Sequence, residues 1–120
     1  MPSSPSLRFL LPLCPEDVRV MAWVKPFAAF KRNVRVAYAW EPVIVKPAER
    51  LDGAIPTRDF VSEPITMRRG LTGAKPDGFC FWLFAAMGLR PCDELHDLFP
   101  GSGAVARAWD SWRAQGSLVA

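Results

Sequence analysis

The chain has 120 residues, of which half are hydrophobic and five are tryptophan, and its formal net charge is +3. This length suits a single domain, and this composition excludes an intrinsically disordered chain. No apolar run approaches the roughly 20 residues that cross a bilayer. No basic residues precede the first apolar stretch, as they would in a signal peptide. We therefore expect a cytoplasmic globular protein.

The cysteines do not indicate a metal site. Cys14, Cys80 and Cys92 are scattered along the chain, and His96 is the only histidine. Zinc sites use closely spaced Cys and His ligands, so no metal is expected, and unpaired thiols fit a reducing compartment. We expect Cys80 and Cys92 to be packing residues. His96 is expected in the core or at a sheet edge rather than as a catalytic base.

The N-terminal part of the chain predicts one helix and two strands. Ser4 suits the cap of a helix with Pro5 at its first position, and Pro12 ends the apolar stripe that follows. Residues 18–24 and 42–46 are rich in β-branched side chains, which is typical of strands.

The middle of the chain predicts an irregular excursion and then a helix. Residues 47–74 are rich in Pro, Gly and charge, with weak strand character at residues 60–61 that allows a short hairpin. Pro76 suits the first position of a helix that Gly88 ends. The apolar side chains of this segment recur at helical spacing, at Phe79, Trp82, Leu83 and Ala86.

The C-terminal part predicts a strand, a glycine turn and a helix. Residues 95–98 read as a strand that Asp97 closes, and Gly101 and Gly103 open the turn. The helix is expected from Ala104 to residue 113 or 114, before Gly116. Such a turn is how α/β proteins build a cofactor pocket, although it also occurs as plain packing. Strands and helices alternate here, which favours an α/β fold with a largely parallel sheet.

Several motifs in order resemble a known family. Lys75-Pro76, a helix, Pro91-Cys92-Asp93-Glu94 and the stretch from Asp97 to Gly103 follow one another, and Trp23-Val24-Lys25-Pro26 and Glu41-Pro42-Val43-Ile44 come earlier. This arrangement resembles the S-adenosylmethionine-binding half of circularly permuted DNA amino-methyltransferases, bacterial or phage-like, which methylate adenine N6 or cytosine N4. The resemblance implies a partial Rossmann-like methyltransferase sheet with flanking helices. It also implies a single, truncated domain over residues 1–120, with residues 75–114 as the cofactor-loop unit.

The resemblance also assigns roles to individual residues. The cofactor loop would be shaped by Asp97, Phe99, Gly101 and Gly103. Lys75 and Pro76 would lie beside the methionine end of S-adenosylmethionine, with Thr72 and Gly73 as further lining residues. An aromatic ring such as Phe99 suits a sulfonium through a cation–π contact.

Two departures from the family pattern weaken the expectation of activity. The family's catalytic motif carries a Pro-Pro pair that this chain lacks, and only Asp110 among acidic residues lies beyond Gly103. We therefore expect cofactor binding without methyl transfer by this chain alone. The alternatives are a non-catalytic DNA- or cofactor-binding module and, less favoured, a dinucleotide enzyme, for which Ala106 stands where a third glycine is needed.

Two kinds of partner are expected. Basic residues that would contact DNA phosphates are Lys25, Lys31, Arg32, Arg35, Arg68 and Arg69, although a solvated charged loop explains them as well. A truncated sheet would also leave an edge open to pairing with another chain, and no membrane partner is expected.

Overall fold

The computed structural model describes residues 4–26, 33–49, 56–64 and 75–119, and side chains as far as residue 115. Within these residues the chain has mixed α and β content: three helices and a small three-stranded mixed sheet. The strands are β1 (Arg19–Val24), β2 (Trp40–Val45) and β3 (Phe60–Ser62). The helices are α1 (Leu7–Leu10), α2 (Asp77–Met87) and α3 (Ala104–Val119).

The sheet has the order β2-β1-β3, which differs from the largely parallel sheet that the sequence predicts. β1 and β2 pair antiparallel, with Met21 opposite Val43, whereas a parallel pair needs a crossover connection of a dozen or more residues. β3 pairs parallel to β1, with Trp23 opposite Val61. The weak strand at residues 60–61 is therefore confirmed, but it joins β1 across the sheet instead of forming a hairpin.

The short strand β3 is held at both ends by tryptophan side chains. The indole Nε1 of Trp82 donates to the carbonyl of Arg58 at 2.8 Å. The indole Nε1 of Trp23 donates to the carbonyl of Glu63, also at 2.8 Å. Two core residues on different elements thus anchor the chain just before and just after β3.

The helix predicted after Lys75 is confirmed. Pro76 is the cap of α2 rather than its first helical residue, and Gly88 ends the helix in the left-handed region at φ +72°. The N–H of Leu89 then bonds to the carbonyl of Phe84, which satisfies a carbonyl of the last turn.

The strand predicted at residues 95–98 is wrong. This segment has no regular secondary structure, bends at Leu98 and pairs with no strand among the described residues; it lies between α2 and α3. A strand needs ladder hydrogen bonds to a neighbouring strand, so an apolar sequence pattern alone does not make one. The glycine turn and the start of α3 at Ala104 agree with the sequence, but α3 continues past Gly116. A glycine costs a helix only about 1 kcal/mol, which is too little to end it.

The first helix is short, and 3₁₀ turns flank it. The 3₁₀ turns η1 (Ser4–Ser6) and η2 (Leu11–Leu13) lie on either side of α1, and no side-chain hydrogen bond caps α1. Pro12 lies within η2, close to the predicted end of this helical segment.

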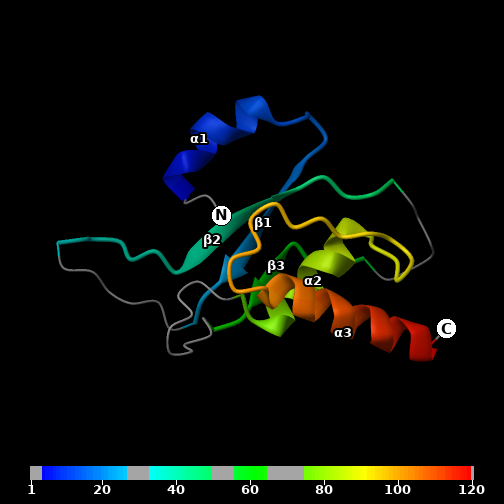
Figure 1. Cartoon of the computed structure of the whole chain (residues 1–120). Helices are drawn as coiled ribbons and strands as arrows, with labels where there is room; N and C mark the ends of the chain where they lie inside the picture. Colours follow the sequence, from blue (N-terminus) through cyan, green and yellow to red (C-terminus); the bar gives the residue numbers. More distant parts are fainter. Residues whose placement is uncertain (1–3, 27–32, 50–55, 65–74, 120) are drawn as a thin grey trace.

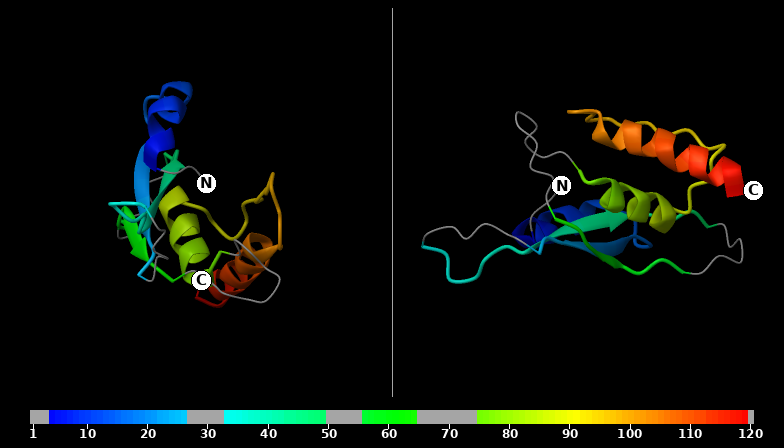
Figure 2. Two further views of the ribbon diagram at one scale, coloured as in Figure 1. Left: turned by 90° about the vertical axis from the view of Figure 1, so that its left-hand side faces the viewer. Right: turned by 90° about the horizontal axis from the view of Figure 1, so that it is seen from below.

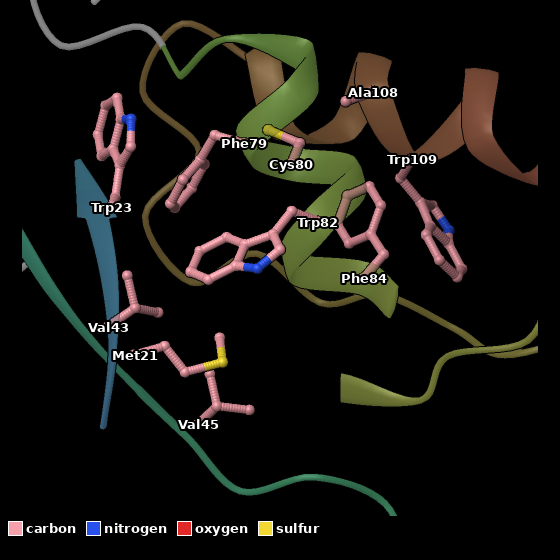
Figure 3. Packing of buried hydrophobic residues seen from close by; sticks show 10 residues of the cluster. All are labelled: Met21, Trp23, Val43, Val45, Phe79, Cys80, Trp82, Phe84, Ala108 and Trp109. Atoms are coloured by element: carbon pink, nitrogen blue, oxygen red, sulfur yellow. The ribbon is translucent and has the colours of Figure 1, made fainter. Parts of the chain in front are cut away.

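The core lies between the sheet, α2 and α3, which form successive layers (Figures 1 and 2). On the sheet side, the rings of Trp23 and Phe79 are 4.6 Å apart. On the other side, Phe84 meets Trp109 edge-on at 5.2 Å and Trp112 at 5.8 Å. Figure 3 shows α2 supplying side chains to both contacts, so this helix joins the sheet to α3. In the part of the chain that the structure describes, no helix is long and apolar enough to cross a membrane.

Candidate functional site

Charged side chains gather on the buried ring of Trp23. This residue lies near the carboxyl end of β1 and is 2% exposed. The Lys25 ammonium lies 4.6 Å from the Trp23 ring centroid, and the Lys75 ammonium lies 4.9 Å from it. Lys25 also forms an ion pair with Glu41 of β2. We call Trp23, Lys25, Glu41, Lys75 and Glu63 the Trp23 cluster.

The two lysines of the Trp23 cluster differ in their electrostatic surroundings. Lys25 is neutralised by the adjacent Glu41 carboxylate. Burial lowers the pKa of Lys75, and this effect exceeds the opposing attraction of Glu41. No described residue forms an ion pair with Lys75. Lys75 is therefore a half-buried cation without an ion-pair partner among the residues that the structure describes.

The first turn of α2 borders the Trp23 cluster. Lys75 and Pro76 precede the helix, and a Cβ added to Gly78 would collide with the Glu63 carboxylate. Glu63 thus lies against the helix N-terminus, where the dipole and free N–H groups favour negative charge. This place accommodates a carboxylate in the folded protein.

A second feature is an open pocket between the loop before α3 and α3 itself. Its volume is about 570 Å³, within the range of ligand sites in proteins. It is lined by Cys92, Asp93, Glu94, Leu95, His96 and Asp97 from the loop, and by Ala106, Trp109, Asp110 and Arg113 from α3. Four of these side chains are carboxylates, so the pocket suits a ligand with hydroxyl or other hydrogen-bond donors.

Cys80 lies within electrostatic reach of both features. Burial raises the pKa of the Cys80 thiol to about 11, with smaller effects from Asp77, Lys75 and Asp97. Lys75 belongs to the Trp23 cluster, and Asp97 lines the pocket. Both segments that carry predicted cofactor residues therefore act electrostatically on this one thiol.

The glycine turn has the backbone that the sequence predicts. Gly101 and Gly103 have φ of +50° and +78°, a region that other residues rarely adopt. Asp97 accepts a hydrogen bond from the N–H of Phe99 at 3.1 Å. The Phe99 ring itself is 89% exposed, so it contacts no pocket wall in this structure.

The predicted DNA-binding residues are only partly described. Lys25 lies in the Trp23 cluster, mostly buried and paired with Glu41, rather than in an open basic loop. Arg35 is exposed. The other four, Lys31, Arg32, Arg68 and Arg69, lie outside the described residues, as do Thr72 and Gly73 of the predicted cofactor set.

Two expectations for single residues need correction, and one residue was missed. His96 and Cys92 are exposed instead of packed, because residues 92–98 lie outside the sheet, whereas Cys80 is buried as predicted. Sequence reasoning missed Glu63, whose only signal is a polar residue directly after a short strand. Within the described residues, no three His, Cys, Asp or Glu side chains gather as a metal site.

Comparisons of the chain with protein-family models, with curated proteins and with solved structures found no match.

Proposed function

We propose that this chain is an S-adenosylmethionine-binding, DNA methyltransferase-like module that does not transfer a methyl group by itself. The observation that carries the proposal is the half-buried Lys75 ammonium, which lies 4.9 Å from the Trp23 ring centroid directly before the N-terminus of α2. Lys75 and Trp23 belong to two separate motifs for which the sequence resembles the cofactor-binding half of amino-methyltransferases.

The residues at the site fit the chemistry of the cofactor. The methionine carboxylate suits the Lys75 ammonium, whereas the N-terminus of α2 already holds the Glu63 carboxylate. Ribose hydroxyls suit the carboxylates of Asp97 and Asp110, which line one pocket. When bound, S-adenosylmethionine supplies an electrophilic methyl group on a sulfonium.

Methyl transfer needs groups that the sequence does not contain. Amino-methyltransferases hold the target base with a Pro-Pro-aromatic motif after the base leaves the stack, and no Pro-Pro pair occurs in the 120 residues. In this proposal the chain's own residues bind and orient the methyl donor. The target base would be held by residues of another protein chain.

Isothermal titration calorimetry with S-adenosylmethionine tests the proposal. We expect saturable binding that Lys75→Ala weakens about tenfold or more, because a charge-assisted hydrogen bond contributes about 1.5–3 kcal/mol. Lys46→Ala is the matched control, since Lys46 pairs with Asp17 and both side chains are more than half exposed. Absence of binding, or equal affinity for both variants, contradicts the proposed pocket. An assay with methyl-labelled cofactor and duplex DNA should show no turnover, and turnover contradicts the inactive assignment.

A non-catalytic DNA-binding module is the second candidate. It is favoured by Arg35, which is exposed and has no ion-pair partner among the described residues. Titration of duplex DNA in the same buffer distinguishes the two. Salt-dependent DNA binding without cofactor binding favours this candidate over the first.

A further inference from the structure

Lys75 has the surroundings of an amine that reacts with electrophiles. Its Nζ atom lies 4.9 Å from the centroid of the Trp23 ring, and Trp23 is 2% exposed. Lys75 itself is half-buried, so it keeps some contact with solvent while it loses part of its hydration. Loss of hydration disfavours the charged form of an amine. The neutral form is the nucleophile, because only it has a free lone pair on nitrogen.

A second cation lies on the same ring. The Lys25 ammonium is 4.6 Å from the Trp23 ring centroid, and Glu41 forms an ion pair with it. An adjacent carboxylate favours the charged form of an amine, whereas a neighbouring cation disfavours it. Burial lowers the pKa of Lys75 more than Glu41 raises it, and Lys25 lowers it further, against a small opposing effect of Cys80. Lys25 is thus the fixed cation of the pair, and Lys75 is the amine that it activates.

We propose that Lys75 is a covalent binding site for an aldehyde, which it takes as an imine. Lysines that are desolvated or lie beside another cation form such adducts with carbonyl compounds. The lone pair of the neutral Nζ attacks the carbonyl carbon and forms a C–N bond. The carbonyl oxygen then leaves as water with the two hydrogens of the amine nitrogen, and a C=N bond remains. The reaction needs neither an oxidant nor a reductant.

The Trp23 cluster favours an imine over an amide at this position. A protonated imine keeps a positive charge on the nitrogen beside the Trp23 ring and within the attraction of Glu41. Acylation of Lys75 would remove this charge, and with it the cation–π contact and the attraction to the carboxylate. The cluster therefore suits an aldehyde better than an acylating agent.

Reductive methylation of the wild-type chain tests this proposal, with formaldehyde as the aldehyde and cyanoborohydride to trap the imine. Peptide mapping by mass spectrometry gives the initial rate at each lysine. Lys46 is the internal reference, because its side chain is 55% exposed and pairs with Asp17. At neutral pH Lys75 should react at least about threefold faster than Lys46, because a larger fraction of its amine is uncharged. This excess should shrink at alkaline pH, where both amines lose their protons.

The reaction is run without S-adenosylmethionine, so its outcome is independent of the cofactor binding that calorimetry measures. In denaturing urea Lys75 and Lys46 should react at rates within about twofold of each other, since the fold no longer separates their environments. Equal rates in the folded wild type overturn the proposal. So does an excess at Lys75 that persists unchanged in urea.

Two variants of Lys25 test its part in activating Lys75. Lys25→Met removes the neighbouring cation and leaves Glu41 to attract Lys75, so Lys75 should react at least about twofold more slowly relative to Lys46. Lys25→Arg keeps the charge and should retain the wild-type ratio. Circular dichroism verifies that each variant is folded, and the wild-type comparison decides the proposal where one is not. A folded Lys25→Met variant with the wild-type ratio overturns the activation of Lys75 by Lys25.

Discussion

Two cysteines of this chain differ sharply in their environment. Cys80 is buried on α2, and its pKa is raised to about 11, chiefly by burial and then by Asp77. Its thiol stays protonated near neutral pH and is a poor nucleophile, because the thiolate is the reactive form. Cys92 is exposed at the rim of the pocket. Cys80 therefore belongs to the packing of the candidate site and not to its chemistry.

The raised pKa of Cys80 predicts a loss of stability at alkaline pH. The folded protein holds this proton more tightly than the unfolded chain does, so the stabilisation is present below pH 9.0 and is lost as the pH rises through about 11. The loss should be at most about 2–3 kcal/mol. Urea unfolding of the wild type and of Cys80→Ala across this window measures it.

In that experiment the wild type should lose more stability than Cys80→Ala, which has no thiol at this position. The lowered pKa of Lys75 has the opposite sign: it makes stability rise with pH below 10.5. Both proteins contain Lys75, so their difference reports on Cys80. Cys92→Ala should keep the wild-type slope. Parallel curves for the wild type and Cys80→Ala would contradict the prediction.

At the scale of elements, the C-terminus of α2 depends on one glycine. Gly88 has φ +72° and begins the turn in which Leu89 bonds back to Phe84. An L-residue in this region is strained by about 1–2 kcal/mol. We therefore expect Gly88→Ala to destabilise the protein by about 1 kcal/mol or more, measured by thermal or urea unfolding.

Gly78→Ala is the control on the same helix. Gly78 lies in the first turn of α2 with an ordinary φ, and the atoms that a Cβ would meet are the flexible end of Glu63. Moving this carboxylate is cheap and alanine favours the helix, so the stability should change by less than about 1 kcal/mol in either direction. Equal losses of stability for Gly88→Ala and Gly78→Ala would contradict the role given to the left-handed conformation of Gly88.

Elements were predictable where local chemistry decides them. β1, β2 and α2 follow from runs of apolar residues with Pro and Gly at their ends, and these signals act over a few residues. Residues 95–98 have a comparable strand pattern, but a strand also needs a neighbour, and the sheet has the order β2-β1-β3. Strand pairing is a property of distant segments, so the pattern alone was not sufficient.

At the scale of the whole molecule, the sequence did not predict which residues meet. Lys25 was assigned to DNA and Lys75 to the cofactor, yet both ammonium groups lie on the Trp23 ring. Their meeting depends on β1 and β3 being parallel, which brings their carboxyl ends to the edge where α2 begins. This meeting of distant residues follows from the topology of the sheet, and the spacing of residues along the chain does not predict it.

The two indole hydrogen bonds around β3 have a consequence for the order of folding. Trp23 belongs to β1 and Trp82 to α2, and each holds a carbonyl at one end of a three-residue strand. Neither donor is in place until β1 and α2 have packed together, and contacts between distant segments form late. We expect Val61→Ala to speed unfolding while leaving the folding rate nearly unchanged, measured by stopped-flow fluorescence. Slower folding with unchanged unfolding would contradict this order, in which β3 is the last piece to join the sheet and the first to leave it.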